Sequence, residues 1–328
     1  MFAEAIEAIL QDQCTPTVVR TIEAGGSSTV LWQALENAGF LKLLATEAEG
    51  GAALPLPELF PVLRSLGYHN MPLPVGQTMV AHALLPSDAV PTGRITLAAA
   101  LRHGAIGQDA TRLTCQLTPC GLVADWVLAR DGDGLLLLPT VSAQLVPTGV
   151  PHSLIATLVW PDDSTAIRFS EGGAALTNFA AALFAAMLSG AMTRVFEMTL
   201  QYCNDRSQFG KSLGKFQAVQ HQLSVMAEHT AAASIAAEAA FRTPNVTPPW
   251  LTAAVAKSRT SEAAVLVASI SHALHGAIGV TAEYDLQLLT RRLHEWRMAH
   301  GSEAYWNPLI GQRVLDSQLT LVDFVRTA

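Results

Sequence analysis

Charged residues are scarce in this sequence. They make up 14% of the 328 residues, and the formal net charge at neutral pH is −7. A protein that binds nucleic acid or an anionic membrane surface through its charge needs a dense cluster of Lys and Arg, and this sequence has none. We therefore expect no nucleic acid among its partners.

Cysteine is also rare. The four cysteines form no CxxC pair and lack the His spacing of a zinc site, so we expect no metal site and buried thiols in a reducing compartment. The N-terminal stretch carries acids and no basic region, which is not typical of a signal peptide. We also expect no apolar run of the roughly 18 residues that a membrane span needs. Together these absences predict a cytoplasmic protein.

Glycine motifs for nucleotide binding are missing as well. Neither GxGxxG nor GxxxxGK[ST] occurs, which argues against a Rossmann or P-loop site. What the sequence has instead is apolar residues, at 50% of the chain, with Ala dominant from Ala180 onward. Small apolar residues in such density are typical of helices that pack on several sides, within one subunit or between subunits. We infer a large core and an oligomer.

The hydrophobic pattern changes twice along the chain. It is helical to about Leu85, strand-like from there to about Phe169, and helical again from Ala174. This order predicts an α+β protein with an N-terminal helical domain (1–92), a small antiparallel β-domain (93–172) and a C-terminal bundle of four or five helices (173–328). The expected strands lie within 95–100, 122–129, 135–138, 153–160 and 166–169, with a hairpin turn at 131–134.

In the C-terminal part we expect helices at about 180–202, 217–241 and 250–275, and two more before Val325. The prolines at 244, 248 and 249 mark a loop, because adjacent prolines cannot continue a helix.

Residues 204–222 form the densest group of polar and aromatic side chains. Arg206 follows an expected helix end, where its guanidinium could grip a phosphate or pyrophosphate side-on, and Phe209 could lie along an adenine or a ribose. The alternative is that Arg206 pairs with Asp205 or Glu228 and that Phe209 only caps the bundle. The pattern alone does not separate the two interpretations.

The segment Arg206-Ser-Gln-Phe-Gly, followed by Phe216-Gln217 and an Ala-rich helix, resembles the RxxFG…FQ segment of acyl-CoA dehydrogenases, a flavoprotein family. Three further segments agree with this resemblance. Residues 31–40, with Glu47 and two glycines at 50 and 51, are similar to the family's N-terminal helical domain. Residues 124–129 are similar to its middle β-domain, and residues 275–283 are similar to its HGGxGxTxE turn.

The resemblance implies that FAD is shared between two subunits. The segments at 206–217 and 275–279 would reach the ADP half of the cofactor held by a neighbouring chain. The side chains and glycine that match the family's contacts are Arg206, Gln208, Phe209, Phe216, Gln217, His275 and Gly276. Two positions depart from the family pattern, with alanine at 273 in place of a glutamine and at 277 in place of a glycine.

The half of the site that a family member keeps for its own flavin has no match here. The family's Thr-Glu-Pro and Gly-Ser-Asp cradle aligns with residues 97–104, which carry no comparable donors, and its Trp-Ile-Thr segment has no clear match at 113–119. An isoalloxazine needs hydrogen-bond donors at its edge in order to accept electrons. The resemblance therefore implies that this chain lacks a flavin cradle.

The catalytic base is also missing. The family supplies a Glu from one of two places, and these align with His300 and Ala180; the Arg used toward the CoA substrate aligns with Ala181. A His can act as a base near neutral pH, but His300 would still need a flavin beside it. We therefore expect no catalytic residue in this chain.

The segments that match the ADP half of the site, together with the missing flavin cradle and the missing base, predict a non-catalytic subunit of a heteromeric α2β2 acyl-CoA dehydrogenase. A full-site subunit would be its partner, an electron-transfer flavoprotein or a similar protein its acceptor, and an acyl-CoA, such as a steroid side-chain CoA thioester, its substrate. Two alternatives remain open. One is a self-sufficient homodimeric flavoenzyme that uses His300, and the other is a structural or regulatory protein without cofactor.

Overall fold

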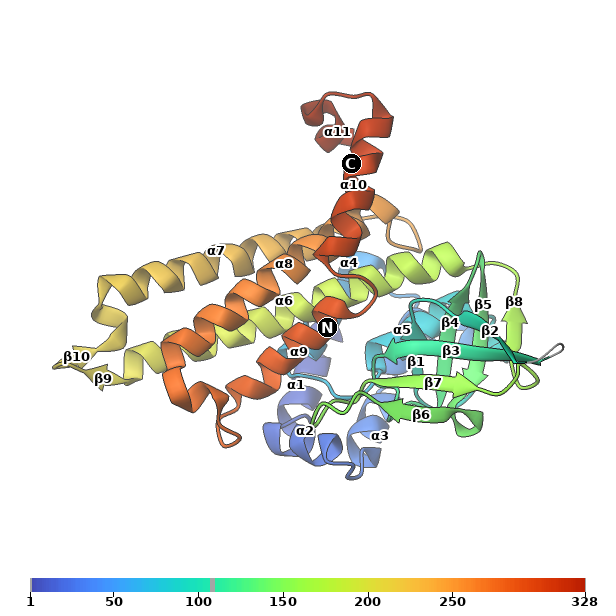
Figure 1. Cartoon of the computed structure of the whole chain (residues 1–328), viewed down its shortest axis with the longest axis horizontal. Coiled ribbons are helices and arrows are strands. Elements are labelled where there is room, and N and C mark those ends of the chain that lie inside the picture. The colour runs from blue at the N-terminus through green and yellow to red at the C-terminus, as the bar shows by residue number, and fades with distance from the viewer. Residues whose placement is uncertain (1, 107–109, 328) are drawn as a thin grey trace.

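The computed structural model describes the backbone of residues 2–106 and 110–327. Long helices form an elongated bundle, a β-unit lies at one end of it, and the N-terminal helices pack along its side (Figure 1). The order of helices, strands and helices confirms the expected α+β class.

The N-terminal helices are short and end at glycines, prolines or loops. In α2, the Thr15 side chain accepts a hydrogen bond from the Val18 amide and Pro16 takes the first helical position, which together fix where the helix begins. The elements of this region are α1 (Phe2–Gln13), α2 (Pro16–Glu23), α3 (Thr29–Asn37), α4 (Leu56–Tyr68) and α5 (Val75–Leu84), with the 3-10 turns η1 (Phe40–Lys42), η2 (Glu47–Glu49) and η3 (Ser87–Ala89).

The β-unit consists of two four-stranded sheets, ordered β1-β4-β5-β8 and β2-β3-β7-β6. All pairs are antiparallel except β1 with β4, which run parallel. The expected hairpin forms between β4 and β5, with Gly132 at φ 62° in its turn. The strands are β1 (Ile95–Ala98), β2 (Arg102–Ile106), β3 (Ala110–Thr118), β4 (Trp126–Asp131), β5 (Gly134–Pro139), β6 (Gln144–Pro147), β7 (Ala156–Trp160) and β8 (Ile167–Phe169).

Each of the five expected strand segments overlaps an observed strand, but β2, β3 and β6 were missed. Strand β6 is solvent-exposed along its whole length, so it has no buried face to produce an alternating pattern in the sequence. In β3 a bulge shifts the register between Cys115 and Thr118 and interrupts the alternation of polar and apolar residues.

The C-terminal helices are longer and more numerous than expected. The first begins seven residues before the expected start at 180, and three helices, not two, follow the third. They are α6 (Gly173–Asp205), α7 (Gln217–Ala239), α8 (Trp250–His275), α9 (Leu286–Met298), α10 (Glu303–Ser317) and α11 (Leu321–Thr327), with the 3-10 turn η6 (Gly276–Val280) after α8.

Helix α6 lies at the centre of the molecule and crosses α4 at very short range. A Cβ added to Gly67 would lie 1.9 Å from the Met187 carbonyl oxygen, and one added to Gly190 would lie 2.0 Å from the Arg64 carbonyl oxygen. Both distances are impossible for real atoms, so this crossing requires glycine on each helix.

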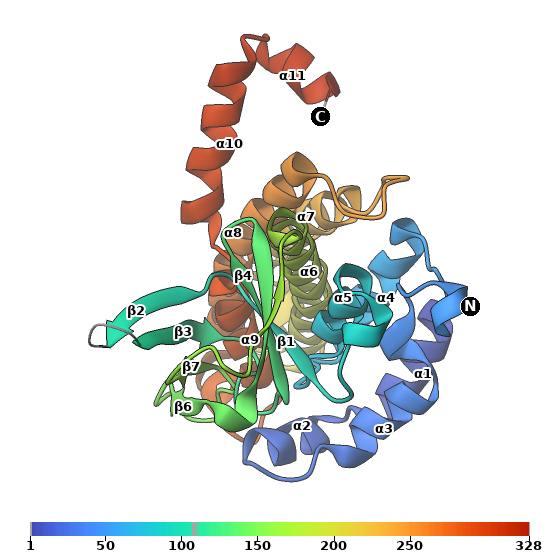
Figure 2. The same ribbon diagram turned by 90° about the vertical axis from the view of Figure 1, so that its right-hand side faces the viewer.

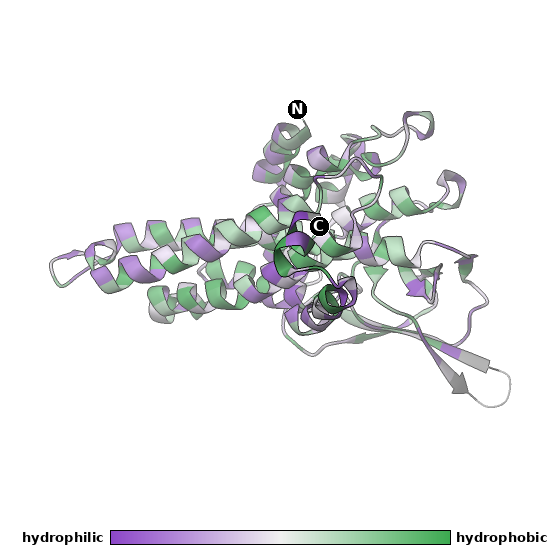
Figure 3. Ribbon diagram, turned by 90° about the horizontal axis from the view of Figure 1, so that it is seen from above, coloured by the Kyte–Doolittle hydropathy of each residue, from purple (hydrophilic) through white to green (hydrophobic). Residues whose placement is uncertain are grey.

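The expectation that no apolar run reaches membrane-spanning length was wrong. Among the described residues, the segments Gly173–Asp205 and Trp250–Val280 are long and apolar enough to span a membrane. This is weak evidence for a span, because the core helix of a globular protein passes the same test. In the first segment 83% of the most apolar window is buried within the fold; in the second only 39% is. Hydrophobic and hydrophilic residues alternate along the extended helices in Figure 3.

Candidate cofactor-binding site

Residues 206–217, which we call the arm, project from the far end of the helical bundle (Figure 1). After α6 ends at Asp205, the arm forms a two-stranded ribbon of β9 (Ser207–Gln208) and β10 (Lys211–Ser212), then the 3-10 turn η5 (Leu213–Lys215), before α7 begins. The two turn residues, Phe209 and Gly210, have φ of 52° and 79°. Two successive positive φ angles match the twist of a tight hairpin.

Phe209 occupies its position at a cost. Its side chain is 90% exposed, and its backbone lies in the left-handed region, which bulky residues avoid. Its ring meets that of Phe216 edge-on at 6.3 Å, and the Lys211 ammonium lies 4.3 Å from the centre of the Phe216 ring. The arm therefore holds an aromatic pair and a cation out in solvent, in a defined arrangement.

Arg206 is exposed, and its side chain makes no hydrogen bond or ion pair with any residue that the structure describes. The surface pair with Asp205 does not form, because Gln201 binds both carboxylate oxygens of Asp205, at 2.9 and 2.8 Å. Gln208 and Gln217 are exposed as well. A guanidinium and two amides are thus available on the arm for a ligand or another chain.

His275 and Gly276 lie at the same end of the bundle but differ in accessibility. The His275 ring stacks on Tyr202 at 4.3 Å, donates from Nδ1 to the Ser271 carbonyl at 2.8 Å, and is 4% exposed. Burial lowers the pKa of His275. Gly276 is exposed, with φ 63° and ψ −143°, a conformation essentially reserved for glycine. The imidazole thus links the ends of α8 and α6, and only the backbone at Gly276 is open to a ligand.

Three hydrogen-bond donors at the edge of the β-unit are already engaged within the chain. The Thr96 hydroxyl donates to the Pro119 carbonyl, the Thr118 hydroxyl donates within its own bulge, and the Leu117 amide donates to the Thr157 hydroxyl at 3.2 Å. Pro119 has no amide hydrogen. These residues do not fit an isoalloxazine ring, whose edge requires donors that are not already engaged.

Beside this edge lies a cavity of about 680 Å³. It is bounded by β3 residues 116–119, loop residues 148–155, the end of α9 and the loop at 299–301, and its surface is mainly apolar. The cavity brings His300 next to the β-unit, which sequence spacing alone could not predict.

His300 is buried and poorly suited to act as a base. Its Nε2 donates to the Leu97 carbonyl at 3.3 Å, which assigns the proton to that nitrogen, and its ring stacks on Phe184 at 5.4 Å. Burial lowers the pKa of His300 to about 4, and the nearby Lys257 charge contributes in the same direction. A group with this pKa has little driving force to remove a proton near neutral pH.

Ala180, the other position where a Glu would be expected, is completely buried on α6, as is Ala181. Neither alanine can bind a substrate or move a proton. Among residues 2–106 and 110–327, no group of three His, Cys, Asp or Glu side chains could hold a metal ion.

Lys257 is a buried cation that sequence reasoning missed. Its ammonium donates to the Ser261 hydroxyl at 2.9 Å and to the carbonyls of Arg297 and Gly301, both at 2.8 Å. It thereby fixes the loop that carries His300 against α8. The sequence did contain a sign of this buried lysine, because Lys257 is a single Lys within an apolar, Ala-rich helix. A charge at such a position is costly unless it is paired.

A second missed cluster joins the N-terminal helices to α9. Glu23, with its side chain almost fully buried, binds Arg291 at 2.7 Å and Arg292 at 2.9 Å, and Arg292 also binds Glu295 at 2.6 Å. Nearby, Arg297 donates a hydrogen bond to Glu303 at 3.0 Å. Long-range pairs of this kind leave no local pattern in a sequence.

Comparisons with known proteins agree with this architecture. The profile of the family described as "Acyl-CoA dehydrogenase, C-terminal domain" matches residues 174–315. The chain is 32% identical to acyl-CoA dehydrogenase IpdE2 of Mycolicibacterium smegmatis over 298 residues, covering 90% of this chain and 91% of that protein. Over 297 residues it is 32% identical to IpdE2 of Mycobacterium tuberculosis, covering 90% of each.

Two solved structures share the whole fold. The ChsE4-ChsE5 complex from Mycobacterium tuberculosis superposes with a TM-score of 0.82 at 20% identity, covering 97% of both chains. A variant of the Tcur3481-Tcur3483 steroid ACAD superposes with a TM-score of 0.80 at 25% identity, covering 96% of this chain and 97% of that one. With helices, strands and helices in the expected order and relatives matched over nine-tenths of its length, this chain belongs to the acyl-CoA dehydrogenase family.

Proposed function

We propose that this chain is the non-catalytic subunit of a heteromeric, FAD-dependent acyl-CoA dehydrogenase, and that its arm completes the ADP half of a cofactor held by a full-site partner subunit. The similar structures support a heteromeric enzyme of this kind, since one is described as the ChsE4-ChsE5 complex and another as the Tcur3481-Tcur3483 steroid ACAD. We propose that the substrate of this complex is an acyl-CoA of the steroid type.

The observation that carries the proposal is the contrast between the two halves of the site. On the arm, Arg206 is unpaired among the described residues and Phe209 is held out in solvent at a backbone cost. At the β-unit, the Thr96 hydroxyl and the Leu117 amide are already used within the chain. One half is therefore arranged for a ligand outside this chain, and the other is not arranged for a flavin.

Within the complex, this chain's residues would bind and orient and would not transfer protons. Arg206 would donate to the pyrophosphate, Phe209 and Phe216 would contact the adenosine, and the exposed backbone at Gly276 would approach the same region. Bound FAD supplies the hydride acceptor for α,β-dehydrogenation. The carboxylate that removes the α-proton would come from the partner, because His300 is neutral and engaged and Ala180 has no functional group.

Exposed apolar surface on the C-terminal helices supports an oligomer. Helices α10 and α11 extend away from the rest of the fold (Figure 2), although Trp306 at the base of α10 is buried. Their exposed apolar side chains include Leu315, Leu321, Val322 and Val325. Exposed apolar side chains gathered on a projecting segment mark a site for another chain.

The test is co-expression with a full-site acyl-CoA dehydrogenase subunit, followed by the flavin absorbance spectrum of the purified complex. We expect a yellow, active complex and a lone chain with little or no colour. Arg206→Ala should weaken flavin retention roughly tenfold or more, since a charge-assisted hydrogen bond to a phosphate is lost. Arg242→Ala, which removes only a surface pair with Glu238, serves as the matched control. Unchanged flavin content in the Arg206 variant would refute the proposal.

The same preparation separates the two alternatives. A self-sufficient enzyme that uses His300 would be yellow when purified alone and would bleach with an acyl-CoA. A cofactor-free paralogue would yield no flavin even with its partner. The acceptor that we propose for the complex is an electron-transfer flavoprotein or a similar protein. We propose a cytoplasmic location, consistent with four unpaired, buried cysteines.

A further inference from the structure

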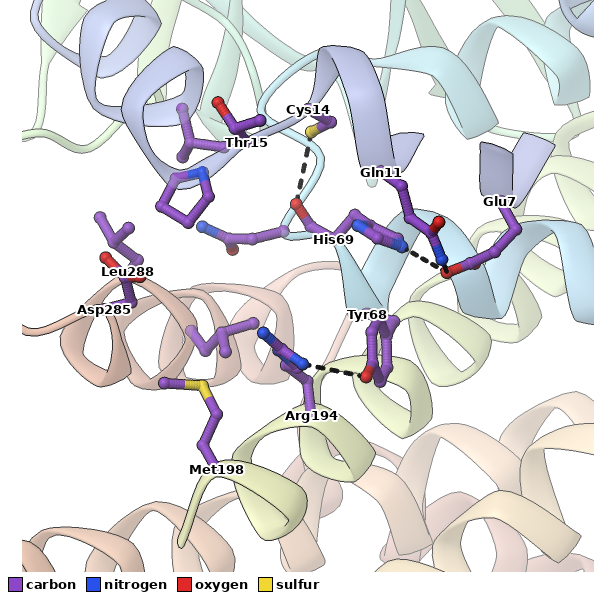
Figure 4. Close-up of a pocket in the computed structure, with 14 residues that line it drawn as sticks. Glu7, Gln11, Cys14, Thr15, Tyr68, His69, Arg194, Met198, Asp285 and Leu288 are labelled. Atoms are coloured by element: carbon purple, nitrogen blue, oxygen red, sulfur yellow. Dashed lines mark hydrogen bonds and ion pairs between the residues drawn. The ribbon is translucent and has the colours of Figure 1, made fainter. Parts of the chain in front are cut away.

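A second cavity, of about 320 Å³, lies between the N-terminal helices and the C-terminal helices α6 and α9 (Figure 4). Helices α1 and α2 bound it on one side, and the end of α4 contributes three consecutive residues, 68–70. Its volume equals that of roughly ten water molecules. None of the residues predicted to contact FAD lines it. We call it the Asn70 pocket.

The acids of the Asn70 pocket already have partners. Glu7 accepts from the Ser65 hydroxyl at 2.9 Å and pairs with His69 Nε2 at 2.7 Å. Asp285 pairs with Arg20 at 2.7 Å. These carboxylates therefore do not call for a cationic ligand.

The guanidinium of Arg194 is differently placed. Its Nη1 donates to the Tyr68 hydroxyl at 3.1 Å, and Tyr68 in turn donates to Glu197 at 2.6 Å. Among the described residues no carboxylate forms an ion pair with Arg194, and its other nitrogens have no protein acceptor. Figure 4 shows this guanidinium extending from α6 toward the pocket beside Tyr68. A planar cation with free donors is suited to a carboxylate.

Asn70 is the second unsatisfied group. It is 5% exposed, and neither its Nδ2 nor its Oδ1 has a hydrogen-bond partner. A buried amide left without partners costs about 1–3 kcal/mol for each group, so a molecule that supplies both an acceptor and a donor would be stabilised here. The left-handed backbone at Asn70, φ 55°, explains why an Asn can stand at this helix end, but it leaves the side-chain amide unsatisfied.

We propose that the Asn70 pocket binds a small monocarboxylic acid that carries a hydroxyl group next to its carboxylate. The carboxylate would accept from Arg194 and from Asn70 Nδ2, the hydroxyl would donate to Asn70 Oδ1, and the apolar tail would lie against Val19, Met198 and Leu289. Arg194 is the one Arg or Lys among the described residues that line the pocket, so it matches one negative charge and leaves the second charge of a phosphate monoester without a partner.

The experiment measures binding of α-hydroxyisocaproate to the purified full-length chain by calorimetry, at millimolar concentrations. Two analogues separate the contributions: isocaproate lacks the hydroxyl, and α-hydroxyisocaproamide lacks the charge. We expect saturable binding of the hydroxy acid, and affinity at least roughly tenfold weaker for each analogue.

Two variants test the assigned residues. Arg194→Met removes the cation and keeps the length of the side chain, and Asn70→Gly removes the amide at a backbone conformation that glycine adopts freely. Each should weaken binding of the hydroxy acid at least roughly tenfold. Arg313→Met, at an exposed position on α10, should leave it unchanged. Thermal unfolding of each variant establishes that it is folded.

Three results would overturn the proposal. The first is no saturable heat with the wild-type chain. The second is equal affinity in the wild type and in both pocket variants. The third is a crystal structure, grown with the hydroxy acid, in which water alone satisfies Asn70. None of these results bears on flavin retention by the arm, so the cofactor proposal stands or fails separately.

Discussion

The contribution of one residue, Lys257, to the stability of this protein should rise between pH 7 and pH 9. Its side chain is completely buried, and burial lowers its pKa from the ordinary value of 10.5 to about 7. Between these two values the unfolded chain binds more protons than the folded one, so the free energy of unfolding increases with pH. With a folded pKa of about 7, the increase from pH 7 to pH 9 is about 2 kcal/mol.

Lys257→Met isolates this contribution. The variant loses the donors to the Arg297 and Gly301 carbonyls, which should cost about 2–4 kcal/mol at pH 9, where the wild-type amine is neutral and still donates. At pH 7 the variant also escapes the cost of a buried charge. Its destabilisation relative to the wild type should therefore be about 2 kcal/mol smaller at pH 7 than at pH 9.

Urea unfolding of both proteins at the two pH values provides the measurement. Other groups also contribute in this range, including buried thiols such as Cys115, whose pKa burial raises from the ordinary value of 9.0 to about 12, so that only the unfolded chain loses this proton near pH 9. These groups are common to both proteins, and their contributions cancel in the difference. Lys42→Met, at an exposed position, should show no pH-dependent effect. If Lys257→Met destabilises the protein equally at both pH values, the assignment of a depressed pKa to this lysine is wrong.

Three further predictions concern packing, charge and backbone. Gly67→Ala should destabilise the fold by about 3 kcal/mol or more, because a methyl group has no room at the crossing with α6. Gly311→Ala, where an added methyl group meets no other atom, should stabilise the fold by up to about 1 kcal/mol. Thermal unfolding of both variants measures this difference. Glu23→Gln should cost about 3 kcal/mol in chemical denaturation because it leaves Arg292 buried with one carboxylate fewer, and a loss below about 1 kcal/mol would contradict this. Phe209→Gly should stabilise the lone chain by about 1 kcal/mol, by relieving its backbone, while lowering flavin content in the complex; a change of the same sign in both assays would refute the assigned role.

The sequence predicted best where local chemistry decides the structure. Both ends of α8 match the expected range of 250–275, because Pro249 precedes the helix and Gly276 follows it with a positive φ. The start of α6 was placed too late, at about 180, although Gly173 is the first helical residue and Gly172, at φ 106°, caps the helix. Strand β6 was missed because an exposed edge strand has no buried face.

The buried groups around the candidate site lay beyond the reach of sequence patterns. The two carbonyls that Lys257 binds are 40 and 44 residues away along the chain. Neither periodicity nor spacing encodes such a contact, because it depends on how α8 packs against α9 and the loop that follows. The exposure of the arm is a different case: the resemblance implied a contact with another chain, and the observed geometry of Arg206 and Phe209 is compatible with it.

Two parts of this chain carry costs that the chain alone does not relieve. At one end of the bundle, Phe209 combines full exposure with a strained backbone; on α10 and α11, Leu315 and Leu321 are exposed on a projecting helix pair. The edge beside the large cavity also carries strained backbone, at Leu117 with φ 45° and His300 with φ 53°, but the Thr96 hydroxyl and the Leu117 amide donate within the chain and burial keeps His300 neutral. Exposed apolar and aromatic side chains on projecting segments are expected of a subunit that contacts another chain.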